Sequence, residues 1–287
     1  MTRPPQNPRP QTSPRSPDVE SEESSILGAM FLGALQGLTE FLPVSSSGHL
    51  VLFQQFFEVG TEHVLFDLVL HLGTLVPVLW FYRAEVGTVL VDLVSGDAPW
   101  AERPGVRLAG LVVAASIPTA AIGLLFEDLF ESLFSAPSVL TLTFALTGVL
   151  LWAAGRFDRS ERAVPLTWTL ALALGLAQGL AITPGISRSG TTIAVALMLG
   201  IRREEAARFS FLMSVPAIGG AALLKLKDAD LATIDLQPLL AGGVTAMVVG
   251  YFALALLVRL VLSGQFTAFR WYAWGAAIAA GAIAVLA

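Results

Sequence analysis

Long apolar stretches, each about the length of a membrane-spanning helix, alternate along the chain with short polar segments. A helix of roughly 20 apolar residues crosses a bilayer, and repeated stretches of this kind are not found in ordinary water-soluble domains. The pattern therefore predicts an all-α, polytopic membrane helix bundle. Six stretches have the length of full spans, namely 64–82, 106–126, 137–155, 207–226, 239–262 and 269–287.

Two further apolar regions, 26–58 and 166–200, are interrupted in their middles by Pro, Ser and Gly. Each region is long enough for two half-helices, but its breakers prevent one continuous helix. Broken backbone is tolerated in hydrocarbon only where protein or a polar cavity satisfies its hydrogen bonds. The sequence therefore predicts two re-entrant helical hairpins whose polar tips lie inside the bundle.

The two interrupted regions share a pattern. Gln36 precedes Gly48 by twelve residues, and Gln178 precedes Gly190 by the same interval, with Gly-Leu after each Gln. Two similar units inserted in opposite orientations form an inverted-topology repeat, and broken helices at matching positions mark the binding site of such folds. We therefore expect one integral-membrane domain over 26–287 in which the two hairpins oppose each other.

Composition and charge placement add an orientation. Hydrophobic residues make up 55% of the chain and charged residues 14%, and there is no cysteine, which excludes disulfides, thiolate catalysis and Cys-ligated metals. If each hairpin returns to the side it enters, one side holds eleven arginines, and the other holds only Lys225 and Lys227, apart from three arginines in the first 25 residues. The positive-inside rule then makes the arginine side cytoplasmic and places both termini and the 127–136 loop outside. The eleven are Arg83, Arg103, Arg107, Arg156, Arg159, Arg162, Arg202, Arg203, Arg208, Arg259 and Arg270.

The first 25 residues differ from the rest of the chain. They are rich in Pro, Ser and charge, and they contain no apolar segment that could serve a signal peptide. Because nothing in them could be buried, residues 1–25 are expected to be a disordered tail.

Of the 17 Lys and Arg residues, only Arg188 falls in the interior of a predicted membrane element, more than three residues from either end. An ionisable group in the membrane is costly, so a functional role is the first hypothesis. Hydroxyls, a helix N-terminus and a guanidinium fork together favour an anion, and phosphate in particular. The structural alternative is an arginine that only neutralises a buried carboxylate. The neighbours that supply the further donors are Ser187, Ser189, Gly190, Thr191 and Thr192.

The first loop supplies the matching acid. Gln36 and Glu40 lie one helical turn apart and share a face, so their oxygens could hold a divalent cation that keeps most of its waters. Glu40 could instead act as a general base, or form a structural ion pair with Arg188. His49 follows Ser46 by three residues beside a run of serines, which favours proton transfer or nucleophilic catalysis. His71 is expected to serve packing, with Asp67 as a possible neighbour of the site.

Taken together, QGLTEFLPVSSSGHL and PGISRSGTT resemble the two signature regions of the bacterial undecaprenyl-diphosphate phosphatase family, also called the bacitracin-resistance protein family. FSFLMSVPAI and IPTAAIGLLF are similar to that family too, so the resemblance covers nearly all of 26–287. It implies a hydrolase of the bacterial cytoplasmic membrane that converts undecaprenyl diphosphate to the monophosphate carrier for cell-wall synthesis. It also implies a divalent cation, Mg²⁺ or Ca²⁺, and a fold with two opposed re-entrant regions.

The resemblance assigns roles by position. Many members carry Glu where this chain has Gln36, which leaves Glu40 as the one expected acid. A known relative carries Gln in place of His71. The resulting hypothesis makes Ser46 the nucleophile, with water or His49 as alternatives that stay open. The residues are Glu40, Ser46, His49 and Arg188 for catalysis, Ser45, Ser187, Arg188, Ser189, Gly190, Thr191 and Thr192 for the substrate, and Gln36 and Glu40 for the metal.

A second class of function fits the same architecture. Inverted repeats with broken helices are typical of transporters, so a secondary transporter or lipid-phosphate flippase is the alternative. The concentration of Ser, His, Glu and Arg in the loops exceeds what solute binding requires and favours the enzyme. The expected partners are a polyprenyl diphosphate lipid and the bilayer, with no nucleic acid, and a homodimer is left open.

Overall fold

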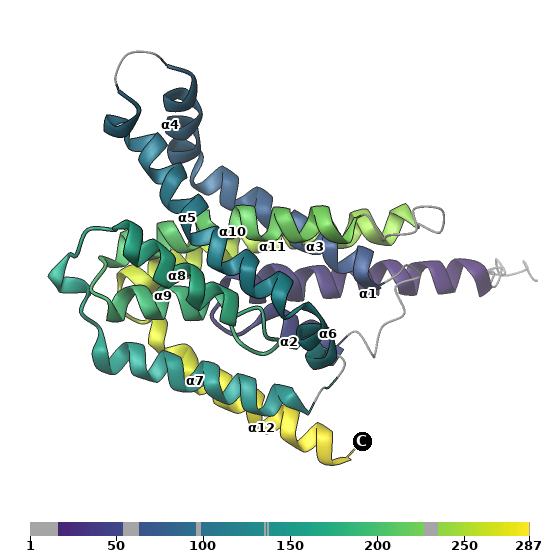
Figure 1. Ribbon diagram of the computed structural model, residues 1–287. Coiled ribbons are helices and arrows are strands. Elements are labelled where there is room, and N and C mark those ends of the chain that lie inside the picture. The colour runs from purple at the N-terminus through teal and green to yellow at the C-terminus, as the bar shows by residue number, and fades with distance from the viewer. Residues whose placement is uncertain are drawn as a thin grey trace, which may run out of the picture.

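The computed structural model describes residues 17–53, 63–95, 99–134, 136, 138–226 and 235–286 of the 287-residue chain. Within these ranges the chain forms helices and short connections and no strand. Most of the long helices run side by side as a bundle (Figure 1). The prediction of an all-α, multi-pass membrane protein is therefore confirmed.

All six predicted spans are helices, and their bounds differ from the predicted ones by a few residues. Five of the six are long and apolar enough to cross a membrane alone, and the first passes the same test together with the helix that follows it. The six are α3 (His63–Phe81), α5 (Pro104–Leu125), α7 (Val139–Phe157), α10 (Arg203–Lys225), α11 (Leu236–Leu262) and α12 (Arg270–Leu286).

Two helices lie where the sequence predicts only connections. Helix α4 (Arg83–Val94) turns by 79° from α3 and buries none of its side chains, so it lies across the end of the bundle. Helix α6 (Glu127–Phe134) occupies the predicted 127–136 loop and buries only Phe130. Both are short and carry charges, so neither has the continuous apolar run by which the spans are recognised.

The first interrupted region forms α1 (Pro17–Phe41) and α2 (Ser46–Phe53). The chain folds back between them, because the Phe53 ring at the end of α2 lies 5.9 Å from the Phe31 ring of α1, measured between centroids. Helix α1 begins at Pro17, so part of it falls within the segment expected to be a disordered tail. Residues 1–16 of that predicted tail lie outside the described residues.

The second interrupted region forms α8 (Trp168–Leu180) and α9 (Arg188–Met198). After α9 the chain returns to the segment that precedes α8: Leu197 O accepts a hydrogen bond from Arg159 N at 3.0 Å, and Gly200 O accepts one from Val164 N at 2.9 Å. Both regions are therefore helical hairpins that break where the sequence predicts.

Asp158 fastens the base of the second hairpin. Its carboxylate accepts hydrogen bonds from Ser160 N at 2.8 Å and from Arg203 Nη2 at 2.9 Å. Burial raises the pKa of this carboxyl, but these donors outweigh burial and hold the pKa below its ordinary value. The two interactions of Asp158 are therefore fully formed at neutral pH and weaken only as the pH falls through the lowered pKa.

Each hairpin packs its first helix against a long span through glycine. Helix α1 lies along α11, and α8 lies along α5. A Cβ added to Gly33 of α1 would lie 2.2 Å from Gly242 O of α11, and one added to Gly175 of α8 would lie 2.0 Å from Ala115 O of α5. Small residues replace the hydrophobic effect as the basis of helix association in lipid. These glycines therefore let the hairpins approach the spans closely.

Gly175→Ala is expected to destabilise the fold by about 1–3 kcal/mol, because the added methyl group collides with backbone that cannot move away. Gly219→Ala in α10 is the matched control, since a Cβ there meets no atom within 4 Å. The control should be neutral or slightly stabilising, because alanine favours a helix more than glycine does. Thermal unfolding in detergent measures both variants, and equal melting temperatures would contradict the close-packing account.

Candidate active site

The two hairpin tips are built alike. Helix α2 is capped by Ser45, whose Oγ accepts a hydrogen bond from Gly48 N at 3.4 Å. Helix α9 is capped by Ser187, whose Oγ accepts one from Gly190 N at 3.1 Å. A serine at this position satisfies a backbone N–H that the helix leaves open, which fixes where each half-helix begins. Ser46 and Arg188 consequently occupy the same place, the first residue of their half-helices.

Small residues bring the tips into contact. A Cβ on Gly48 would lie 3.0 Å from the Cα of Gly185, and one on Gly190 would lie 3.1 Å from the Cβ of Pro43. Ser189 Oγ donates across the same junction to Leu42 O at 3.5 Å. The loops that are polar exceptions in an apolar sequence are therefore neighbours in the fold, and the second loop satisfies part of the backbone of the first.

Glu40 is the centre of this junction. Its Oε2 accepts hydrogen bonds from Ser46 Oγ at 2.6 Å and from Gln36 Nε2 at 3.0 Å. Its Oε1 forms an ion pair with Arg188 Nη2. The side chain of Glu40 is only 6% exposed, so the carboxylate depends on these donors to stay charged in the protein interior. The structure thus brings together Gln36, Glu40, Ser46 and Arg188.

His71 faces the same carboxylate. Its Nε2 lies 3.8 Å from Glu40 Oε2, and its Nδ1 is 2.7 Å from Asp67 O. Because a carbonyl oxygen can only accept, Nδ1 carries the hydrogen, and Nε2 is the atom turned to Glu40. His71 therefore lies beside the Glu40 junction, a position that the sequence, which predicts a packing role for it, does not reveal. A histidine on an otherwise apolar full span was the available signal, but the chain around it has no break that would mark a site.

His49 is directed elsewhere. Its Nδ1 donates to Ser45 O at 2.7 Å, so in the neutral ring Nε2 accepts from the Tyr272 hydroxyl at 2.8 Å. The ring also stacks on Tyr272 and meets Phe144 edge to face. Both nitrogens are thus engaged, neither of them with Ser46. Tyr272 of α12 joins the surroundings of the site, and nothing in the sequence near the loops pointed to it.

The hydroxyls of the second loop differ in their availability. Ser187 and Ser189 lie 3.3 Å apart, oxygen to oxygen, while Thr192 donates to Arg188 O at 2.9 Å and also bonds Ser210. These three hydroxyls hold the loop in place. Thr191 differs, because its Oγ1 is buried and has no hydrogen-bond partner in the described part of the chain. Arg188 and Thr191 are therefore the donors left for a bound anion.

The residues at this junction do not by themselves fit a resident divalent cation. The described ranges contain no group of three His, Asp or Glu side chains that could hold a metal. Glu40 already takes donors from Ser46, Gln36 and Arg188. Beside Glu40, Gln36 Oε1 is a buried amide oxygen with no partner among the described atoms. One amide oxygen and a carboxylate paired with arginine are too few hard ligands for Mg²⁺ or Ca²⁺.

Comparison with known proteins agrees with the geometry. A relative from Carboxydothermus hydrogenoformans, named undecaprenyl-diphosphatase, is 47% identical over 252 residues, which cover 86% of this chain and 92% of the relative. Relatives with the same name from Halothermothrix orenii and Rubrobacter xylanophilus are 40% and 42% identical, over 87% and 91% of this chain and 94% and 99% of their own lengths. The family described as Bacitracin resistance protein BacA matches residues 29–279. The chain therefore belongs to this family.

Proposed function

We propose that the protein hydrolyses undecaprenyl diphosphate to undecaprenyl phosphate and inorganic phosphate, returning the lipid carrier to cell-wall synthesis. The observation that carries this proposal is the Ser46 hydroxyl, 2.6 Å from a buried carboxylate whose other oxygen is paired with Arg188. A hydroxyl nucleophile, a carboxylate base and an arginine that can bind an anion then lie together at one junction inside an apolar bundle. The names of the relatives supply the substrate.

Ser46 is the proposed nucleophile. Its oxygen attacks the terminal phosphorus of the lipid diphosphate while Glu40 Oε2 takes the hydroxyl proton. The bond from that phosphorus to the bridging oxygen breaks, and the lipid leaves as its monophosphate. Glu40 passes its proton to the oxygen of the departing monophosphate, which restores the carboxylate. Water then attacks the phosphoserine with Glu40 again as general base, the proton goes on to Ser46 Oγ, and inorganic phosphate is released. The hydrogen bond between Ser46 and Glu40 replaces the proton shuttle through His49 that the sequence suggests.

Arg188 is proposed to hold the transferred phosphoryl group. Only its Nη2 is paired with Glu40, so the guanidinium retains N–H groups for phosphate oxygens. Phosphoryl transfer is catalysed mainly by positioning and by stabilising charge on these oxygens. Thr191 Oγ1, the buried hydroxyl without a partner among the described residues, is a second donor. His71 Nε2, across Glu40 from Arg188, is proposed to contact the same group.

The test is phosphate release from undecaprenyl diphosphate by the purified protein in detergent. We expect release of one phosphate per lipid, with the lipid monophosphate as the other product. A protein that moves the lipid across reconstituted vesicles without releasing phosphate would contradict the proposal and favour the transporter.

A divalent cation, Mg²⁺ or Ca²⁺, is proposed to arrive with the diphosphate instead of residing in the protein. Chelation is then expected to raise KM more than it lowers kcat, because it removes charge neutralisation of the substrate. Binding of Mn²⁺, followed by electron paramagnetic resonance, should be weak for the free protein and strong when a non-hydrolysable diphosphate lipid is added. Tight stoichiometric binding to the free protein would show instead that the ion is resident.

The inverted-topology repeat is proposed to underlie the matching hairpins. Its support is the identical spacing from Gln36 and Gln178 to the capping serines Ser45 and Ser187. A second support is the pairing of α1 with the last span of the second unit, α11, and of α8 with the last span of the first, α5. Matching broken helices at one junction are where such folds place their substrate.

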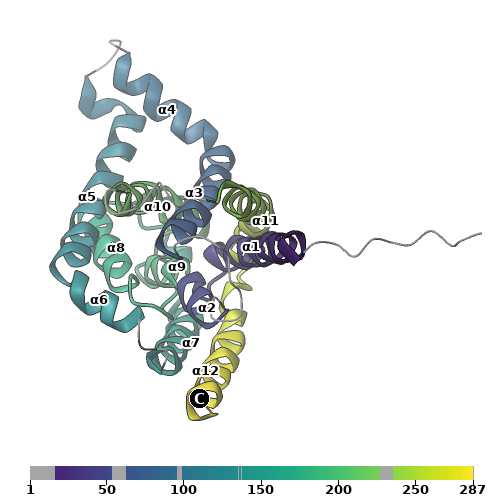
Figure 2. The ribbon, with the colours of Figure 1, turned by 90° about the vertical axis from the view of Figure 1, so that its right-hand side faces the viewer.

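The proposed location is the bacterial cytoplasmic membrane, with the arginine-rich end in the cytoplasm and both termini outside. In Figures 1 and 2 the described start of α1 and the C-terminus lie toward the same end of the bundle. The chain has no cysteine, so single cysteines report topology cleanly. Asp128→Cys should react with an impermeant maleimide on intact spheroplasts, and Glu161→Cys should react only after lysis. The reverse pattern would invert the assignment.

A further inference from the structure

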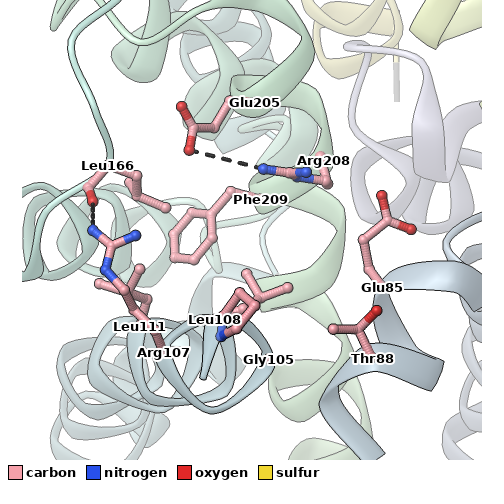
Figure 3. Close-up of a pocket in the computed structure, with 11 residues that line it drawn as sticks. Glu85, Thr88, Gly105, Arg107, Leu108, Leu111, Leu166, Glu205, Arg208 and Phe209 are labelled. Atoms are coloured by element: carbon pink, nitrogen blue, oxygen red, sulfur yellow. Dashed lines mark hydrogen bonds and ion pairs between the residues drawn. The ribbon is translucent and has the colours of Figure 1, made fainter. Parts of the chain in front are cut away.

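A pocket lined by both apolar and charged side chains lies at the arginine-rich end of the protein and shares no residue with the Glu40 junction. It has a volume of about 300 Å³, which suits a small polar group better than a whole lipid. Its walls come from four segments: α4, the start of α5, the loop before α8, and α10 (Figure 3). The lining residues used below are Glu85 of α4, Arg107 and Leu108 of α5, Leu166 of the loop, and Glu205, Arg208 and Phe209 of α10.

The pocket lies at the depth of lipid headgroups. Helix α3, 19 residues long, spans roughly 28 Å at 1.5 Å per residue, close to the thickness of the hydrocarbon core. The chain then turns by 79° into α4, which buries no side chain and exposes Leu90, Val91 and Val94. A helix that leaves a span at nearly a right angle and exposes both apolar and charged residues lies in the membrane interface. The pocket beneath α4 therefore faces headgroups.

Four charged side chains surround Phe209 in this pocket. In the view of Figure 3 they follow one another as Arg107, Glu205, Arg208 and Glu85, so that positive and negative groups alternate. Their formal charges cancel, and a simple anion or cation therefore gains no net attraction. A ligand that carries one positive and one negative group matches this arrangement.

The four charges leave hydrogen-bonding capacity for a ligand, although Arg208 and Glu205 form a long ion pair. Arg208 Nη2 lies 3.8 Å from Glu205 Oε1, which is beyond hydrogen-bond distance. Arg107 Nη2 donates to Leu166 O at 2.7 Å, and this single bond leaves most of its five N–H groups for a ligand. Glu85 forms no hydrogen bond or ion pair with any described residue. Charged donors and acceptors thus face a space bordered by the apolar Leu108 and Phe209.

We propose that this pocket binds the headgroup of an aminophospholipid, a phosphate diester joined to a primary ammonium group as in phosphoethanolamine. Arg107 donates to the phosphate, with Arg208 as a second donor. Glu85 and Glu205 accept from the ammonium group, and Leu108 and Phe209 contact the glycerol and the first methylenes of the acyl chains. The occupant anchors α4 against α5 and α10 at the membrane surface, a role separate from the hydrolysis of the diphosphate.

Lipid binding to the purified protein, counted by native mass spectrometry, tests the proposal. Phosphatidylethanolamine should bind about tenfold more tightly than phosphatidylcholine, whose quaternary ammonium cannot donate a hydrogen bond to Glu85 or Glu205. It should also exceed phosphatidylglycerol, which has the phosphate but no cation. Soluble glycerophosphoethanolamine should compete, because the recognised chemistry is in the headgroup.

Two variants locate the site. Arg107→Gln and Glu85→Gln should each remove most of the preference for phosphatidylethanolamine, while phosphate release from undecaprenyl diphosphate in detergent stays unchanged. Glu85→Gln is the safer of the two for folding, since α4 buries no side chain. Arg270→Gln is the matched control: it belongs to the same set of eleven arginines but lies over the Trp271 ring, outside the pocket. Equal binding of the three lipids, or a preference that survives both variants, would overturn the proposal.

Discussion

Arg188→Ala is expected to lower kcat/KM for phosphate release by about 10³-fold, the usual effect of removing an arginine from a phosphoryl-transfer site. Two functions are lost together: the donors to the phosphoryl oxygens and the counter-charge of Glu40. Arg188→Lys keeps the charge without the planar fork and should recover only part of the rate. Steady-state phosphate release measures all three proteins.

A double variant separates catalysis from folding. Removing Arg188 alone leaves the buried Glu40 carboxylate unpaired, which typically costs about 3–5 kcal/mol. Adding Glu40→Gln removes that charge, so the double variant should regain stability while remaining inactive. If the double variant recovers both stability and turnover, the Glu40–Arg188 pair is only a structural ion pair. Arg83→Gln, which removes an exposed guanidinium that lies over the Trp80 ring, controls for the loss of an arginine far from the chemistry.

The sequence predicts the parts of the fold that membrane physics dictates. Spans follow from apolar length alone, and the hairpins follow from the breakers around Pro43 and Pro184, because hydrocarbon permits broken backbone only inside protein. Arg188 and Glu40 stand out for the same reason, as charges that lipid would not tolerate. These features of the sequence can be interpreted from the properties of the surrounding lipid alone, without knowledge of tertiary contacts.

Side-chain direction is what the sequence does not reveal. The local sequence favours catalysis for His49 and packing for His71, yet the fold turns His71 toward Glu40 and His49 toward Tyr272. Tyr272 is 223 residues from its partner, a separation at which no local pattern carries information. The sequence does not predict helix α4 for another reason. An interfacial helix has neither the length of a span nor the polarity of a loop.

Ser46→Ala is expected to have the largest effect of any substitution, a fall in kcat of at least about 10⁴-fold, because the nucleophile itself is removed. Ser47→Ala is the matched control in the same run of serines. Among the described residues, the Ser47 hydroxyl bonds Ser45 Oγ, at 3.3 Å, and forms no hydrogen bond with Glu40. The Ser47→Ala variant should keep most of its turnover. The ratio of kcat between Ser47→Ala and Ser46→Ala then measures how much catalysis depends on a hydroxyl beside the Glu40 carboxylate.

The covalent intermediate distinguishes serine attack from the alternatives that the sequence left open. If Ser46 attacks, rapid acid quenching of the wild-type protein with substrate labelled in the terminal phosphate should trap a phosphoserine at residue 46. Phosphohistidine is acid-labile and alkali-stable, so a label that survives only in alkali would point to His49 or His71. Direct attack by water gives no labelled protein and leaves Ser46→Ala with substantial turnover. Glu40→Gln separates the steps further: if Glu40 is the base for both transfers, it should slow formation of the phosphoserine and its hydrolysis alike, by roughly 10²–10⁴-fold.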